Sequence, residues 1–253
     1  MRTRFGLAGA WLGAALAAAA ASGPDTSGWE SRVLLSAAVT SRLSAAEATV
    51  TAEPAGGPGG GAALRMGVAV DHFGGEEKYP VGWPRIARGF EEAADRTWSA
   101  WDYLRFRIRA ESPRTALPAV PLTLSLRAPD KARSFSRSLD EVRKGEWAEV
   151  LVPVRAIADP SDVTSMTLSI ADANYSHGDR VDFLIGEVAL VRPREPVLTE
   201  FAPAAGAIWA DARRLPVRFR LLGVPDGGQA AVRFELREGR SEEHTSELQS
   251  RQS

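Results

Sequence analysis

Short segments of the chain alternate apolar and polar residues with a period of two. This is the period of a β-strand that turns one face to a core and the other to solvent. In the clearest case Leu104, Phe106 and Ile108 alternate with arginines. Further alternating segments are 64–70, 122–127, 150–154, 166–170, 215–221 and 231–236. The pattern predicts many short strands, with a short helix expected only near 41–48 or 90–96.

The alternation changes phase once, near the end of this series of strands. Apolar residues occupy odd positions up to Ile185 and even positions from Val188 onward. A β-bulge at Gly186–Glu187 would produce this shift, because one extra residue turns the following side chains to the opposite face. Glycine- and proline-rich segments separate the strands. The predicted fold is therefore all-β, an antiparallel jelly-roll β-sandwich.

Residues 192–196, Arg-Pro-Arg-Glu-Pro, indicate a domain boundary, since two prolines and three charges follow the last strand of the series. We expect a β-sandwich over 22–192 and the start of a second, immunoglobulin-like sandwich over 193–239. So short a second segment cannot bury a full core, and it is therefore predicted to be truncated.

The two ends of the chain have sequences that differ from the rest. Residues 1–21 combine an arginine-containing start, an alanine-rich apolar stretch and small residues before a cleavage site, which predicts a signal peptide and a secreted or periplasmic product. A retained membrane anchor is the alternative. Residues 240–250 resemble a translated sequencing adapter, so 240–253 is interpreted as an artefactual disordered tail and the natural protein as continuing beyond Gly239. A natural polar tail is the competing interpretation.

Composition excludes several classes of function. The 253 residues carry a formal net charge of -1, so the chain lacks the excess of positive charge that is typical of nucleic-acid-binding proteins. There is no cysteine, so disulfides and thiolate catalysis are excluded. One of the three histidines, His244, lies in the discounted tail. No motif for a serine hydrolase, a phosphate-binding loop or a zinc protease is present, and no pair of carboxylates stands out, so no catalytic residue is assigned.

Three tryptophan- and valine-rich strand segments carry a resemblance to a known family. Residues 98–108, 145–153 and 181–191 resemble core strands of galactose-binding-like β-sandwich modules, which occur beside catalytic domains in secreted bacterial carbohydrate-active proteins. The resemblance covers about 29–192. It implies a sugar-binding or purely structural module, often one with a structural calcium ion. No calcium loop matches residue by residue, so no cofactor is assigned.

Sugar binding by such a sandwich needs aromatic faces to stack on sugar rings and polar groups to bind hydroxyls. Two predicted loops, 71–88 and 174–179, supply these residue types. The candidate ligand-binding residues are His72, Tyr79, Trp83, Arg85, Tyr175 and His177. In the alternative interpretation the aromatic residues of the first loop cap one end of the core, and the second loop is an ordinary polar turn.

Two other groups of side chains have competing interpretations. Arg105, Arg107 and Arg109, with Arg127 on another strand, could line a face that binds acidic glycans, whereas a solvated arginine surface is the alternative. The tryptophans that adjoin strands, including Trp98, are interpreted as core.

The sequence thus predicts a non-catalytic accessory module that binds a polysaccharide or oligosaccharide, within a secreted bacterial carbohydrate-active protein. No membrane span is expected after signal cleavage. Two alternatives stay open. One is a structural or adhesive cell-surface β-sandwich without a small ligand. The other is the N-terminal fragment of a glycoside hydrolase or polysaccharide lyase whose catalytic domain lies downstream.

Overall fold

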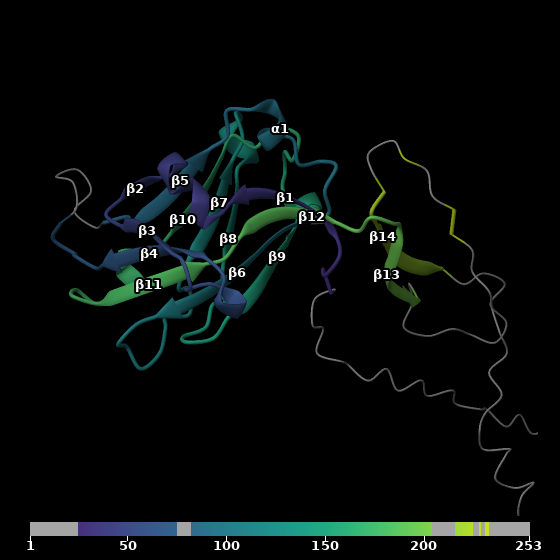
Figure 1. The fold of residues 1–253 in the computed structure, drawn as a ribbon. Helices are drawn as coiled ribbons and strands as arrows, with labels where there is room; N and C mark the ends of the chain where they lie inside the picture. Colours follow the sequence, from purple (N-terminus) through teal and green to yellow (C-terminus); the bar gives the residue numbers. More distant parts are fainter. Residues whose placement is uncertain (1–24, 75–81, 204–215, 225–227, 229–230, 233–253) are drawn as a thin grey trace, which may run out of the picture. The chain divides into compact units, whose positions relative to one another are not determined.

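The computed structural model describes residues 25–74, 82–203, 216–224, 228 and 231–232 (Figure 1). The chain divides into two compact units, the first ending at Pro193 and the second beginning at Arg194. The predicted signal peptide, candidate residue Tyr79 and the tail after Gly239 lie outside the described residues.

Two antiparallel sheets make up the first unit (Figure 1). The seven-stranded sheet contains β1 (Glu30–Leu35), β3 (Thr49–Glu53), β4 (Ala63–Ala69), β6 (Tyr103–Glu111), β9 (Ala148–Pro153), β11 (Arg180–Ile185) and β12 (Val188–Arg192). The five-stranded sheet has the order β2 (Ser44–Ala46), β5 (Arg85–Gly89), β10 (Ser165–Ser169), β7 (Thr123–Arg127) and β8 (Phe135–Ser138). The predicted antiparallel β-sandwich is confirmed.

One hydrophobic cluster fills the space between the sheets. On β6 the side chains of Leu104, Phe106 and Ile108 are buried, and they meet apolar residues such as Leu124 and Leu168 from the other sheet in the same cluster. The arginines between them on β6 face away from this core. Burial of one face of each strand is what the period of two requires.

The predicted shift of phase corresponds to a break between two strands. β11 ends at Ile185 and β12 begins at Val188, and both pair with β6, one along each half. Between them the Gly186 N–H donates to the carbonyl oxygen of Arg107 at 2.8 Å. The two-residue interruption changes which side chains face the core, as expected at 186–187.

Other elements differ from the sequence-based expectation. The short helix α1 (Ala93–Arg96) lies within the expected 90–96. The alternative helix at 41–48 was wrong, because that stretch contains β2 between a 3-10 helix and a turn. The loop expected over 71–88 is shorter, since β5 begins at Arg85.

The 3-10 helices are Ala37–Arg42, Pro58–Gly60, Lys131–Arg133, Val154–Ala156 and Asp172–Asn174. In the described part of the chain, no helix has the length and apolarity to cross a membrane.

A buried ion pair joins α1 to both sheets. Arg88 of β5 is 5% exposed, and Asp95 of α1 accepts hydrogen bonds from Arg88 and from Arg32 of β1, each at 3.1 Å. The Asp95 carbonyl oxygen accepts from the indole N–H of the buried Trp98 at 2.7 Å. The Arg88 guanidinium also lies 5.2 Å from the ring centroid of Phe90. Burial lowers the pKa of Arg88 because it disfavours the charged guanidinium. The nearby Asp95 carboxylate acts in the opposite direction and stabilises this charge.

The described part of the second unit is a two-stranded antiparallel ribbon of β13 (Val197–Pro203) and β14 (Val217–Leu222). The pairing shifts between Thr199 and Ala202, where Glu200 has a positive φ of 54°. β14 corresponds to the strand expected at 215–221. Most of the strand expected at 231–236 lies outside the described residues.

Candidate functional site

The two loops that carry the candidate residues meet at one end of the sandwich. Ala69, at the end of β4, pairs with Arg180, at the start of β11, so the segments beyond these residues are neighbours. The backbone N–H of His72 donates to Nδ1 of His177 at 3.3 Å, and the two imidazole centroids are 6.0 Å apart. Strand pairing therefore brings together two candidate residues that are distant in sequence.

An exposed phenylalanine stands beside these histidines. Phe73 is 83% exposed, and its ring meets the His177 imidazole edge-on with centroids 4.9 Å apart. Oδ1 of Asp71 accepts the Phe73 backbone N–H at 2.9 Å and lies 3.5 Å from Nδ1 of His177. Sequence reasoning missed Phe73, although an aromatic residue followed by two glycines was a usable signal. An exposed aromatic face of this kind offers a surface for stacking.

Trp83 and Arg85 form a second aromatic group at this end of the five-stranded sheet. Trp83 is 43% exposed, and the Arg85 guanidinium lies 4.4 Å from the centroid of its indole ring. Arg85 also donates to the Trp83 carbonyl oxygen at 3.1 Å. The Trp83 backbone N–H donates to Oε2 of Glu47 at 2.7 Å, which attaches this segment to the turn between β2 and β3. Part of the indole therefore remains available at the surface.

Asp172, in the turn after β10, links the two groups. Its carbonyl oxygen lies 3.2 Å from Nε2 of His72. Its side chain is buried, and Oδ2 lies so close to Gly82 that an added side-chain carbon there would overlap it and Oε2 of Glu47. Burial, followed by the nearby charge of Glu47, raises the pKa of Asp172. A side chain at position 82 would therefore require both carboxylates to move.

Tyr175 is placed differently from the other candidates. It is 4% exposed, and its hydroxyl donates to the carbonyl oxygen of Pro121 at 2.7 Å. Burial raises the pKa of the phenol well above its usual value. The side chain anchors the 174–179 loop to the segment that precedes β7 and presents no ring face to solvent.

Removing this hydroxyl is expected to lower stability. Tyr175→Phe leaves the buried Pro121 carbonyl without its donor, which costs about 1 kcal/mol in the free energy of unfolding. Urea denaturation followed by tryptophan fluorescence measures the change. Unaltered stability would show that the hydroxyl does not anchor the loop.

The outer face of the five-stranded sheet continues from Arg85 as a surface of small hydroxyl side chains. Residues opposite one another in the register share a face of the sheet. We call this surface the hydroxyl face, and its members are Thr123, Ser125, Ser136, Ser138, Thr167 and Ser169. Ser136 and Ser138 are exposed and Thr123 and Ser125 are half-buried, whereas Thr167 and Ser169 on the central strand β10 are buried. The accessible hydroxyls can both donate and accept hydrogen bonds.

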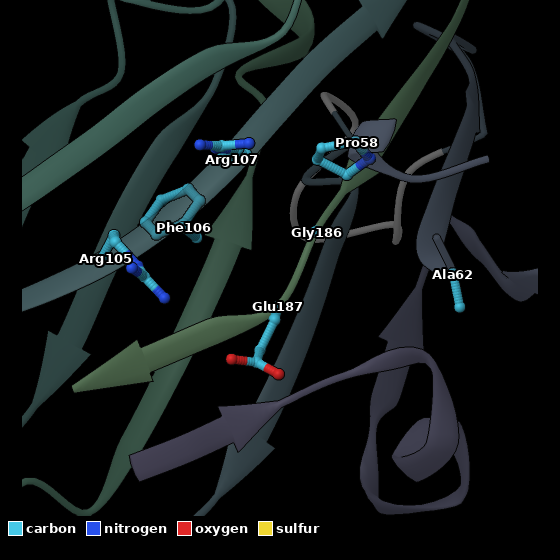
Figure 2. Close-up of a pocket in the computed structure, with 7 residues that line it drawn as sticks. All are labelled: Pro58, Ala62, Arg105, Phe106, Arg107, Gly186 and Glu187. Carbon is cyan, nitrogen blue, oxygen red and sulfur yellow. The ribbon is translucent and has the colours of Figure 1, made fainter. Parts of the chain in front are cut away.

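The arginines singled out from the sequence do not form one surface. Arg105, Arg107 and Arg109 lie on the outer face of the seven-stranded sheet, whereas Arg127 belongs to the other sheet. At the break between β11 and β12, a hollow of about 320 Å³ adjoins the first two of these arginines (Figure 2). Its lining consists of Pro58, Ala62, Arg105, Phe106, Arg107, Gly186 and Glu187. Because a carboxylate shares this hollow, its lining lacks the uniform positive charge that would favour an acidic glycan.

Comparisons by sequence found no match: no protein-family model and no curated protein matches the chain. Solved structures do match. An exo-β-agarase matches at 13% identity and a TM-score of 0.45, over 62% of this chain and 24% of the agarase. The chain thus spans about a quarter of the length of that enzyme.

Two further matches are single modules. A carbohydrate-binding module specific for non-crystalline cellulose, CBM28, matches at 16% identity and a TM-score of 0.40, over 62% of this chain and 92% of the module. The CBM22-2 xylan-binding domain from Paenibacillus barcinonensis matches at 10% identity and a TM-score of 0.39, over 60% and 92%.

Proposed function

We propose that the first unit is a non-catalytic carbohydrate-binding module of a secreted bacterial carbohydrate-active protein, and that it contacts a polysaccharide or oligosaccharide at the loop end of the sandwich. Phe73, His72 and His177 form one part of this surface, and Trp83 and Arg85 form the other. The observation that carries the proposal is the exposure of aromatic rings beside imidazole and guanidinium groups on a rigid sandwich. Loops on rigid scaffolds are common positions for ligand sites.

The chemistry of this surface suits a neutral sugar. One face of a pyranose ring presents C–H groups that pack on an aromatic ring, while its hydroxyls need donors and acceptors. Phe73 and Trp83 supply the rings. The imidazoles of His72 and His177, the Arg85 guanidinium and the adjoining hydroxyl face supply polar groups.

The carboxylates around this surface support a binding role over hydrolysis. Hydrolysis of a glycoside uses two carboxyl groups on either side of the scissile bond. Here Glu47 is exposed but its Oε2 accepts the Trp83 backbone N–H, and Asp172 is buried, so the two do not present a pair of free carboxyl groups to an approaching sugar. Asp71 is engaged by the Phe73 N–H.

Affinity electrophoresis of the whole chain tests the proposal. Gels containing soluble xylan, mannan, β-glucan or agarose should retard the protein in at least one case, and Phe73→Ala should weaken that binding about tenfold because the exposed ring is lost. Val33→Ala removes an exposed apolar side chain from β1 and should leave retardation unchanged. A folded protein retarded by no glycan would contradict the proposal and favour a structural or adhesive module.

A further inference from the structure

The hollow at the break between β11 and β12 lies away from the loop end of the sandwich. It has a volume of about 320 Å³ on the outer face of the seven-stranded sheet (Figure 2). The six residues of β11 run between this hollow and the loop end, and a strand of that length spans about 20 Å. The hollow is therefore separate from the surface that carries Phe73 and Trp83.

A glycine-rich turn over 56–61 builds one wall of this hollow. A side-chain carbon added at Gly57 would lie 2.5 Å from the carbonyl oxygen of Ala62, so any other residue there would require the backbone to move. The ring of Pro58 lies against the break, because a carbon added at Gly186 would be 3.5 Å from its Cδ. The wall is thus a tight turn packed on the sheet.

The polar groups of the hollow keep hydrogen-bonding capacity. Glu187 is exposed, and its carboxylate forms no hydrogen bond or ion pair with any residue that the structure describes. The Arg107 side chain is 56% exposed, with its Nε 4.0 Å from Oε1 of Glu149. Arg105 donates to the Thr26 hydroxyl at 2.9 Å, which uses one of the five N–H groups of its guanidinium. The hollow therefore offers both charged donors and a charged acceptor.

We propose that this hollow is a second carbohydrate-binding site, which takes one neutral sugar unit. The inference deepens the proposed function and rests on it. Adjacent sugar hydroxyls both donate and accept, so Glu187 can accept from one pair while Arg107 donates to another. The Pro58 ring supplies an apolar surface for C–H groups. A volume of about 320 Å³ is at the lower end of the range for small-molecule sites, which suits a single unit.

The charges around the hollow favour an uncharged ligand. The two guanidinium groups of Arg105 and Arg107 are set against the carboxylates of Glu187 and Glu149. An anionic sugar would gain from the arginines but would be repelled by Glu187. A neutral sugar uses both kinds of group without this penalty.

Two separate sites make the module bivalent. One module could then contact two glycan chains, or one long chain at two points, and its apparent affinity for a polysaccharide would exceed that for a short oligosaccharide. The hollow has no exposed aromatic ring among its lining residues, so it is the weaker of the two sites.

NMR titration of the whole chain labelled with ¹⁵N tests the inference. The probes are xylotriose, mannotriose, cellotriose and neoagarobiose, which are too short to bridge the two sites. The Phe73→Ala/Trp83→Ala double variant removes the exposed rings of the loop end. In this variant the amide signals of Gly186 and Arg107 should still shift saturably with at least one probe. Trigalacturonate, an anionic counterpart, should shift them less.

Further substitutions in the double variant locate the second site. Glu187→Gln should weaken the response at Gly186 about 10- to 100-fold, because a charged hydrogen-bond acceptor is lost. Arg107→Met should act in the same direction. Both positions are exposed, so the Tm should change little. Glu146→Gln, the same change at an exposed position outside the hollow, should keep the response.

Two outcomes overturn the inference and leave the proposed function standing. One is a double variant in which Gly186 and Arg107 respond to no probe, although the loop end of the wild-type protein does. The other is a response that survives both Glu187→Gln and Arg107→Met, which would place the second site elsewhere. Signals that shift at the hollow but not at His72 and Phe73 of the wild-type protein would support the inference and contradict the proposed position of the glycan at the loop end.

Discussion

Asp95→Ala is expected to lower the free energy of unfolding by about 3–5 kcal/mol, because it leaves a charged arginine buried without its partner. The Arg88 side chain is 6% exposed, and Asp95 binds it at 3.1 Å. Arg32 loses the same carboxylate. Guanidinium groups stay charged in proteins, so Arg88 cannot avoid the penalty by losing its proton. Urea denaturation of the whole chain measures the loss.

A surface pair provides the matched control for this variant. Asp162 pairs with Arg96, and both side chains are about a third exposed. Asp162→Ala should therefore cost less than about 1 kcal/mol. Replacing Arg88 by methionine in the Asp95→Ala background should restore part of the lost stability, since an apolar side chain then fills the buried space. Equal losses at Asp95 and Asp162 would contradict the assignment of Asp95 as the partner of a buried charge.

Trp83→Ala is expected to weaken glycan binding by about 10- to 100-fold, on the basis of the proposed function. The substitution removes the larger of the two exposed rings and the surface on which the Arg85 guanidinium stacks. Stability should change little by comparison, because much of the ring already faces solvent. Titration calorimetry with the glycan that retards the wild-type protein gives the change in Kd.

A second tryptophan–arginine stack serves as the control. Trp147 packs against Arg109 at 5.2 Å, and Arg109 lies on the outer face of the seven-stranded sheet. Trp147→Ala should keep the affinity of the wild-type protein. The reverse result, with loss of binding in Trp147→Ala and none in Trp83→Ala, would move the glycan site to the arginine-bearing face.

Alternation of apolar and polar residues was enough to predict the central strands. β6 and β7 each bury alternate side chains, and in β10 the apolar core residues Met166 and Leu168 alternate with polar ones. The alternation that a β-strand with one core-facing side requires is therefore present in the residues of all three strands. The change of phase at 186–187 located the break between β11 and β12 for the same reason. These features depend on local sequence.

Strands without that signal escaped prediction. β2 has only three residues, so it shows no clear period. β5 was placed within a loop. In the sequence, Arg88 looks like a polar surface residue, but its side chain points inward. Its buried charge is stabilised by the partner Asp95 and the neighbouring Phe90 ring. Burial of a charge depends on groups distant in the chain, which no local pattern reports.

Local sequence was sufficient to predict the all-β fold, the alternating core and the loops in which candidate residues lie. Which of these residues meet depends on the packing of segments that are distant in the chain. Pairing of β4 with β11 places His72 beside His177, and packing places Tyr175 in the core. Glu47 and Asp172 come from turns that follow different strands, yet both reach Gly82. Such sites arise because strands that pair or pack bring together the turns at their ends, whatever the separation in sequence.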